Sequence, residues 1–462
     1  MKLLFPIVVV TVLALPTIVC ADTTITSNGI TWKFVADYQA GRFVNGDPWV
    51  IGPVTITSIT NTLNDPAFTP RRGQNGSMLN PGITIKQGYE SAITRNYDES
   101  MNASLPNGQP VSDKNPLILP PNSTLVSTVS WLFNSPTELE PTAPRFDSIT
   151  GVPRSATRSA GILTVLSQAP SADAFRPPYV GTDKTINFRT SKLDYSKLPA
   201  LSLPPNASAP DMKSMADSFS RTWLDHGNTW IGAANHPTLH MPNYGRDMAK
   251  LVVDATLLLF TDPSPVGKNP DKDRLIIGLV QFGIDSAGIA DNGGGWPADG
   301  GHGLGRKWPI LFAGALLSDA HLLGVGQWET RFQENEQTFY VSQTEVDLSN
   351  SATWSPDRRA PVQPYTATDI GKPEWGIAHA KNPKVDNAHW SATYREVNGA
   401  AIPGFALAAR LMNLKKAWNH DAFFDYCDRY MAWRIDMPPV ANQPSKFLVA
   451  MWNAYRPTAP KE

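Results

Sequence analysis

Cysteine is almost absent from this chain of 462 residues. Only Cys20 and Cys427 occur, and Cys20 lies in a segment that we expect to be removed on export. A mature chain that keeps Cys427 alone cannot form an intramolecular disulfide. Its stability must therefore come from a large apolar core, which a chain of this length can bury. Cys427 lies in a helical pattern and is expected to be buried there.

An excess of charge of one sign is also missing. Charged residues make up 18% of the chain, and the formal net charge is -1. Proteins that bind nucleic acid usually carry a basic excess. Nucleic acid is therefore not expected as a partner.

Long apolar runs are confined to the N-terminus. Residues 3–19 are apolar and follow Lys2, and residues 19–21 form a small-residue cleavage site. Residues 1–21 are thus predicted to be a signal peptide, which makes the protein secreted, to the extracellular space or the periplasm. No other apolar run approaches the ~20 residues that span a bilayer, so no membrane partner is expected. The oligomeric state is unknown from the sequence.

Two familiar kinds of catalytic site lack their motifs. No Gly-x-Ser-x-Gly sequence occurs, which disfavours a serine nucleophile on a strand-to-helix turn. His236 and His240 have the spacing of a helical zinc-binding pair, but Pro237 and Pro242 make a helix there unlikely. No cofactor and no catalytic metal are expected, and the sequence does not decide on a structural calcium ion.

The pattern of apolar residues divides the chain into two parts. Residues 22–200 alternate as β-strands do and are interrupted by turn residues, which predicts an antiparallel β-sandwich-like domain. Residues 201–210, rich in proline and serine, form the predicted linker. Residues 211–462 show the three- and four-residue spacing of helices, which makes the fold class α+β multidomain. The clearest strands are predicted at 30–35, 49–59, 125–133 and 161–166.

A polar and aromatic patch lies late in the predicted β domain, at residues 175–179 and Lys184. It is placed either to reach over a neighbouring site or to form an ordinary contact between the domains.

The predicted helices are joined by connections of unequal length. Three long loops, at 225–244, 291–304 and 341–395, alternate with short connections. In an up-down array of helices, alternate connections lie at the same end, so the three long loops are expected to meet. The helices are predicted at 211–224, 245–260, 271–290, 305–323, 328–340, 396–417, 420–435 and 445–455.

The long loops and the helix starts that follow them hold most of the unusual chemistry. The second loop opens a glycine-rich stretch at residues 291–308, and glycine lets backbone approach a partner closely. The candidate residues are Asn235, His236, Tyr244 and Arg246 from the first loop; Trp296, His302, Arg306 and Lys307 from the second; and His389, Trp390, Tyr394 and Arg395 from the third.

Basic residues occupy the first turn of the helices that follow these loops. A cation at a helix N-terminus opposes the helix dipole. The arrangement is more favourable if an anion binds between the cations and the helix ends, which themselves attract anions. The alternative is that each arginine pairs with a nearby carboxylate, such as Asp247 or Glu396.

Asparagine, histidine, tyrosine and arginine together fit β-elimination from a polysaccharide that contains uronic acid. Arginine or asparagine neutralises the substrate carboxylate, and tyrosine or histidine moves the protons. The expected catalytic residues are Tyr394, His302, His236 and Tyr244. The expected substrate-binding residues are Asn235, Arg246, Trp296, Arg306, Lys307, His389, Trp390 and Arg395.

The chain resembles the (α/α)-toroid polysaccharide lyases, such as alginate and glucuronan lyases. The Asn235-His236 pair and the Tyr244, Arg246, Tyr394 and Arg395 elements carry this resemblance, over roughly residues 211–435. It implies an incomplete (α/α) toroid after the β domain, with an acidic polysaccharide as substrate. In those lyases the β domain commonly follows the toroid, whereas here it precedes it.

Two other functions remain open. A glycoside hydrolase on a helical toroid needs two carboxylates across the scissile bond, and Asp299 with Asp386, Glu374 or Glu396 can supply them. A non-catalytic carbohydrate-binding protein would use the tryptophans and arginines without needing His302 and Tyr394 together.

Overall fold

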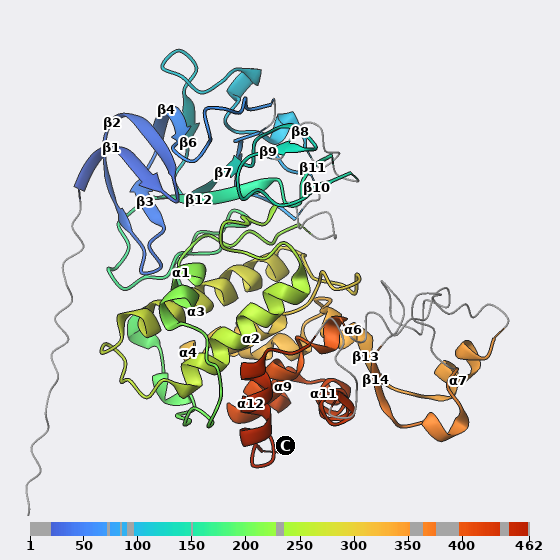
Figure 1. Cartoon of the computed structure of the whole chain (residues 1–462). Coiled ribbons are helices and arrows are strands. Elements are labelled where there is room, and N and C mark those ends of the chain that lie inside the picture. The colour runs from blue at the N-terminus through green and yellow to red at the C-terminus, as the bar shows by residue number, and fades with distance from the viewer. Residues whose placement is uncertain are drawn as a thin grey trace, which may run out of the picture.

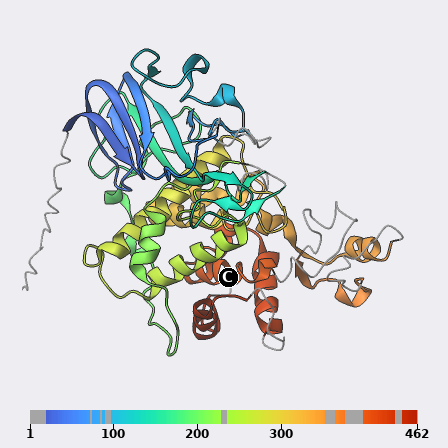
Figure 2. The same cartoon turned by 45° about the horizontal axis from the view of Figure 1, so that its top comes forward.

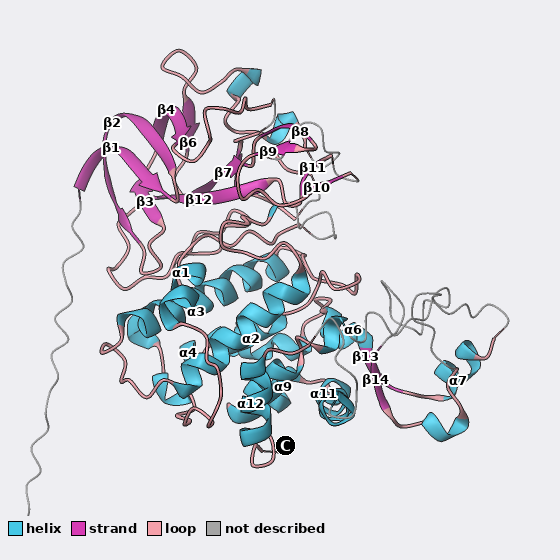
Figure 3. Cartoon of the chain, in the orientation of Figure 1, coloured by secondary structure: helices cyan, strands magenta, loops and turns pink. Residues whose placement is uncertain are grey.

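The structure is a computed structural model in which a β-sheet region is followed by a helical region (Figure 1, Figure 3). This confirms the mixed α and β fold class. The predicted signal peptide lies outside the described residues, except for its last two positions. The structure describes residues 20–71, 74–83, 86–89, 97–148, 151–227, 235–351, 364–375, 397–434 and 443–460.

One curled sheet of eight strands forms the β region. Its order is β5-β7-β12-β3-β2-β4-β6, and β1 pairs with β2. All neighbours are antiparallel except β12 and β3, which run parallel. The strands are β1 (Cys20–Ser27), β2 (Ile30–Arg42), β3 (Pro48–Ile51), β4 (Val54–Asn61), β5 (Ser77–Leu79), β6 (Leu117–Leu119), β7 (Ser123–Ser130) and β12 (Thr157–Leu166). Two small sheets pair β8 (Phe133–Ser135) with β9 (Glu138–Leu139) and β10 (Phe146–Asp147) with β11 (Val152–Pro153).

All four predicted strands correspond to strands of this sheet. The stretch at 49–59 is two strands, β3 and β4, because Gly52-Pro53 interrupts it. Proline has no amide hydrogen to donate to a neighbouring strand.

Five helices in the described part of the helical region have ten residues or more. They are α2 (Gly245–Thr261), α3 (Pro270–Asp291), α4 (Lys307–Leu317), α11 (Asp421–Arg434) and α12 (Lys446–Tyr455). Shorter ones are α1 (Met212–Phe219), α5 (Ala320–Leu323), α6 (Gln333–Gln337), α7 (Gln343–Ser349), α9 (Pro403–Leu411) and α10 (Lys415–Trp418). A two-stranded ribbon of β13 (Thr338–Tyr340) and β14 (Pro373–Trp375) leads to α7, which projects from the helical body in both views (Figure 1, Figure 2). The 3-10 turns are η1 (Glu99–Met101), η2 (Pro106–Gly108), η3 (Thr190–Lys192), η4 (Tyr195–Lys197), η6 (Gly324–Gln327) and η7 (Ala367–Asp369).

The long helices begin where local sequence signals predict. Asn269 caps α3, its side chain accepting from the backbone amides of Asp271 and Lys272, and Pro270 occupies the first helical position. Proline is favoured there because its missing amide hydrogen would have no partner in any case. Both α2 and α3 match their predicted ranges to within one residue at each end.

Four predicted helices differ from the structure. The helix predicted at 305–323 is divided into α4 and α5. The helix predicted at 328–340 is wrong: α6 covers five residues of it, and the chain then turns into β13. The helix predicted at 396–417 is divided into α9 and α10, with Pro403 at the first position of α9. The helix predicted at 211–224 ends at Phe219.

The sheet and the helices share a continuous apolar core. β7 is buried along its whole length, and its side chains alternate between two clusters. Leu125 and Val129 face the interior of the β region, whereas Val126 joins the cluster formed with the helices. Strand β12 alternates in the same way, with Ile162 toward the helices. This face of the sheet is turned toward the helical region, and connecting segments of the chain run between the two (Figure 1).

The patch at residues 175–179 crosses this boundary. Phe175 and Tyr179 are buried in the shared core. Arg176 is 2% exposed and forms ion pairs with Asp47 at 2.6 Å and with Asp285 of α3 at 2.5 Å. One guanidinium thus connects the β region, the segment after β12 and a central helix.

Asp254 on α2 provides a test of pH-dependent stability. Ser445 Oγ donates to its carboxylate at 2.7 Å, but burial raises the pKa of Asp254 to about 6. Because the folded pKa exceeds the ordinary value of 3.8, the contribution of Asp254 to stability should be highest below pH ~4 and fall as the pH rises through 6. Asp254→Asn should therefore raise the free energy of unfolding by about 3 kcal/mol at pH 7 and not at pH 4. Urea unfolding at both pH values measures this, and an equal gain at both would contradict the assignment.

None of the helices in the described ranges has both the length and the apolar character required to cross a membrane.

Candidate functional site

The first two long loops meet at a buried carboxylate, Asp225. The Arg306 guanidinium binds it through two contacts, Nε to Oδ2 at 2.6 Å and Nη2 to Oδ1 at 3.0 Å. His236 Nε2 lies 3.0 Å from Oδ1, and its other ring nitrogen lies 3.2 Å from the carbonyl oxygen of Pro242. All three side chains are at most 4% exposed. Arg306 therefore holds the two loops together and is not directed at solvent.

The charges of this cluster determine the state of Asp225. Burial alone would raise the pKa of Asp225, but the Arg306 charge and the bond to His236 outweigh it and lower the pKa to about 2. The carboxylate therefore stays ionised at the pH of most environments. Its stabilising effect is present above the ordinary pKa of 3.8 and is lost as the pH falls through about 2.

His226 follows Asp225 in the chain and lies at the boundary with the β region. Its Nε2 contacts the Tyr89 hydroxyl at 3.0 Å and Gln87 Oε1 at 2.9 Å, and its Nδ1 contacts the Tyr179 hydroxyl at 3.1 Å. Burial lowers the pKa of His226 to about 4, so the ring is neutral at pH 7. With both ring nitrogens engaged inside the protein, His226 supports the loop and does not face a ligand.

Tyr244 and His302 are the accessible part of the site. Their rings meet edge to face with centroids 4.6 Å apart, and both side chains are partly exposed. The Arg246 guanidinium lies 5.2 Å from the Tyr244 ring centre and pairs with Asp247 through two contacts of 2.8 Å. The structure thus brings His302 of the second loop against Tyr244 of the first, with Arg246 on the tyrosine ring.

Close backbone packing joins these loops at the start of α2. A side chain on Gly245 would place its Cβ 2.0 Å from the carbonyl oxygen of His302. One on Gly301 would lie 2.5 Å from the Tyr244 hydroxyl and 2.9 Å from Asn398 Oδ1. Only glycine permits either approach, so the glycine content of the second loop serves contact with its neighbours.

Two predicted binding residues of the second loop lie apart from Tyr244 and His302. Trp296 is buried and stacks on Phe332. Lys307 is fully buried; its Nζ donates to the Trp418 carbonyl oxygen at 2.6 Å and to Asn335 Oδ1 at 3.2 Å. Burial lowers the pKa of Lys307 to about 7. Both side chains have roles in the core of the helical region.

The predicted residues of the third loop, His389, Trp390, Tyr394 and Arg395, lie outside the described residues.

Two buried amides near these loops have unused hydrogen-bonding capacity. Asn235 is fully buried, and within the described part of the chain neither atom of its side-chain amide has a partner. Asn398, which the sequence analysis did not select, donates from Nδ2 to the Gly300 carbonyl oxygen at 2.8 Å. Its Oδ1 has no partner among the described residues. Asn398 carries no local motif, and only its contacts with the glycine-rich stretch reveal it.

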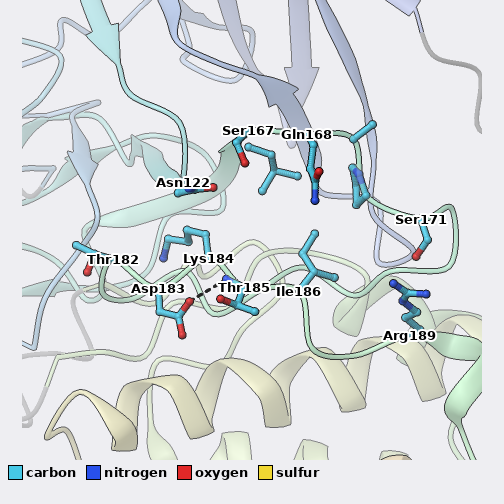
Figure 4. A pocket seen from close by; sticks show the side chains of 13 residues that line it. Asn122, Ser167, Gln168, Ser171, Thr182, Asp183, Lys184, Thr185, Ile186 and Arg189 are labelled. Atoms are coloured by element: carbon cyan, nitrogen blue, oxygen red, sulfur yellow. Dashed lines mark hydrogen bonds between the residues drawn. The ribbon is translucent and has the colours of Figure 1, made fainter.

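A second candidate location is a polar cavity of about 460 Å³ between the end of β12 and the following segment (Figure 4). Asn122, Ser167 and Gln168 line one wall, and Thr182 and Arg189 belong to the other. Lys184 also lines it, but its Nζ donates to three backbone carbonyls, those of Pro178, Tyr179 and Val180. No histidine, tyrosine or cysteine lines the described walls of this cavity. Burial lowers the pKa of Lys184 to about 7, but its Nζ is held by the three carbonyl oxygens.

No three histidine, cysteine, aspartate or glutamate side chains within the described ranges are grouped as a metal ion requires. His240, the partner of His236 in the spacing noted above, points its Nε2 at the Thr222 carbonyl oxygen, 2.8 Å away.

Asp225→Asn tests the buried cluster. The amide retains the shape but leaves the Arg306 charge buried without a counter-charge, so we expect the free energy of unfolding to fall by about 3 kcal/mol. Asp247→Asn is the matched control, because its pair with Arg246 is partly exposed and should contribute under ~1 kcal/mol. Urea unfolding of both variants at pH 7 measures the difference. Equal losses would mean that Asp225 is not the centre of the loop contact.

Comparison of the chain with protein-family models, with curated proteins and with solved structures finds no match in any of the three.

Proposed function

We propose that this protein is a secreted polysaccharide lyase that cleaves a uronic-acid-containing polysaccharide by β-elimination. The observation that carries the proposal is the contact of Tyr244 with His302, with Arg246 beside the tyrosine ring. Tyrosine and histidine are the proton-transfer groups that this reaction needs, and arginine supplies positive charge for a carboxylate. Both residues are partly exposed, as a reacting pair must be, although Nδ1 of His302 is buried.

The proposed reaction breaks one carbon–oxygen bond without adding water. A basic side chain removes the proton on C5 of the uronate, and the electron pair forms a double bond between C5 and C4. The bond from C4 to the glycosidic oxygen breaks, and an acidic side chain gives that oxygen a proton. Tyr244, His302 and Tyr394 are the candidates for these two transfers, and either order of roles is compatible with the Tyr244–His302 contact.

Neutralisation of the substrate carboxylate lowers the cost of removing the C5 proton. We assign this task to Arg246 and to Asn235, whose amide is buried with its donors unused among the described residues. His389, Trp390 and Arg395 remain proposed binding residues of the third loop. In this proposal, four of the predicted residues have a structural role and do not bind substrate, because each makes its contacts inside the protein. They are Arg306, His236, Trp296 and Lys307.

The finer architecture is part of the same proposal. We infer an incomplete (α/α) toroid for the helical region and a sandwich-like form for the β region. Helices joined by alternating short and long connections support the toroid, as does the meeting of the first two long loops at Asp225.

The hydrolase alternative has one carboxylate in a suitable place. The Asp299 carbonyl oxygen accepts from the backbone amide of His302 at 2.9 Å, so Asp299 belongs to the same turn. Of its possible partners, Glu374 accepts from Arg429 and from the Trp375 amide. Asp386 and Glu396 lie outside the described residues.

Incubation with alginate, glucuronan and related uronans tests the proposal. A lyase generates an unsaturated uronate that absorbs in the ultraviolet. Reducing ends without that absorbance would identify a hydrolase, and retention on the polymer without any cleavage would identify a binding protein. Boiled protein and a neutral polysaccharide serve as controls.

A further inference from the structure

The glycine-rich stretch cannot hold its own shape. Gly300, Gly301 and Gly303 contribute no side chains, and glycine loses more conformational freedom on ordering than any other residue. His302 nevertheless has to keep one position relative to Tyr244 for proton transfer. Some other part of the chain must therefore fix the stretch.

Helix α6 supplies that support through three of its side chains, Gln333, Glu334 and Glu336, which bond the backbone of the stretch. Gln333 and Glu334 bind the backbone at Gly300, Gly303 and Gly305, and Glu336 accepts from the Ala298 amide at 2.6 Å. The side chain of Asn335 bonds the Lys307 side chain, accepting from Nζ at 3.2 Å, and not the backbone. A helix of five residues thus makes contacts along residues 298–307.

Gln333 is the residue of this set that flanks His302 on both sides. Its Oε1 accepts from the Gly303 amide at 2.7 Å, and its Nε2 donates to the Gly300 carbonyl oxygen at 2.7 Å. Nε2 also donates to Gln337 Oε1 at 2.7 Å. A single orientation of the amide satisfies all three partners, since one is a donor and two are acceptors.

Other hydrogen bonds also hold the turn from Gly300 to Gly303 in place. Asn398 gives the Gly300 carbonyl oxygen a second donor at 2.8 Å. The His302 amide donates to Asp299, and Arg306 Nη1 donates to the His302 carbonyl oxygen at 2.9 Å. Gln333 is fully buried, so water does not compete for its bonds.

We propose that Gln333 is a positioning residue that fixes the turn from Gly300 to Gly303 and thereby sets the orientation of the His302 imidazole against Tyr244. This inference rests on the proposed function for its catalytic consequence. Gln333 itself touches the backbone of the turn and no reacting atom.

The test compares Gln333→Met and Gln333→Glu with the wild-type full chain. Methionine removes the three hydrogen bonds, and we expect amide exchange in residues 298–305 to become at least about tenfold faster. In Gln333→Glu, one carboxylate oxygen still accepts from the Gly303 amide, but the other faces two acceptors, the Gly300 carbonyl oxygen and Gln337 Oε1. The increase in amide exchange in this variant should therefore become smaller as the carboxyl is protonated at lower pH. Asn335→Ala is the control on the same helix, and it should leave exchange in residues 298–305 unchanged.

Two further readouts separate positioning from simple stability. Nitrogen-15 spectra of the histidine rings should show a shifted His302 titration in Gln333→Met and not in Asn335→Ala. On a uronan that the wild type cleaves, kcat should fall about tenfold with KM little changed, because the turn and not the binding surface is altered. Wild-type exchange rates and an unshifted His302 titration in Gln333→Met would overturn the proposal.

Failure of the proposed function has a different signature. A wild type that cleaves no uronan removes the lyase assignment, whereas the exchange and His302 measurements still decide whether Gln333 fixes the turn. Should Gln333→Met fail to fold, the pH-dependent recovery expected of Gln333→Glu decides instead, and its absence would overturn the proposal.

Discussion

Arg176→Met is expected to lower the free energy of unfolding by about 5 kcal/mol at pH 7, because it leaves two buried carboxylates without their guanidinium. Asp47 and Asp285 are both nearly inaccessible to solvent and reach Arg176 from opposite sides of the boundary between sheet and helices. Burial already raises the pKa of Asp285 with Arg176 present. The loss should be seen as a lower urea midpoint at an unchanged slope.

A compensated variant distinguishes the charge from the packing. Arg176→Met combined with Asp47→Asn and Asp285→Asn removes all three charges and should recover most of the stability, since neutral groups of similar shape replace a buried ion cluster at little cost. Lys213→Ala is the control for a solvent-exposed pair, that of Lys213 with Asp217, and should change the stability by under ~1 kcal/mol. If Arg176→Met alone were as stable as the wild type, the ion pairs of Arg176 with Asp47 and Asp285 would not hold the two regions together.

Tyr244→Phe is expected to reduce uronan cleavage by about 10²–10⁴-fold, because it removes the hydroxyl that exchanges a proton in the proposed reaction. The ring and its contact with His302 remain, so the unfolding midpoint should hardly change. Tyr340→Phe is the matched control: Tyr340 is the exposed last residue of β13, and its hydroxyl bonds Asp425 of α11. Full activity in Tyr244→Phe would remove Tyr244 from the mechanism.

Tyr394→Phe belongs in the same experiment. If Tyr394 is the second proton-transfer group, its loss should also abolish turnover while the fold stays intact. Unchanged activity in this variant would leave Tyr244 and His302 as the pair that moves both protons.

The sequence predicted the long helices well because their signals are local. The apolar spacing of α2 and the Asn269-Pro270 start of α3 do not depend on distant residues. Helix α6 could not be predicted in this way. Its length is determined by side chains that bond a loop thirty residues earlier, and the turn into β13 depends on pairing with β14.

The sequence predicted which residues belong to the candidate site better than it predicted their contacts. Loop composition selected His302, Tyr244 and Arg246, which the structure brings together. The same reasoning placed Arg306 opposite a substrate anion, whereas the structure gives it a buried internal anion, Asp225. Pairing with a carboxylate of the protein was an alternative from the start, but the partner is 81 residues away and not adjacent.

Strands β7 and β12 bury both of their faces, one in the β region and one against the helices. The two halves of this chain are therefore not interchangeable modules. A recombination event that joined this helical region to a different sheet would have to bring a matching apolar surface at the positions of Val126 and Ile162.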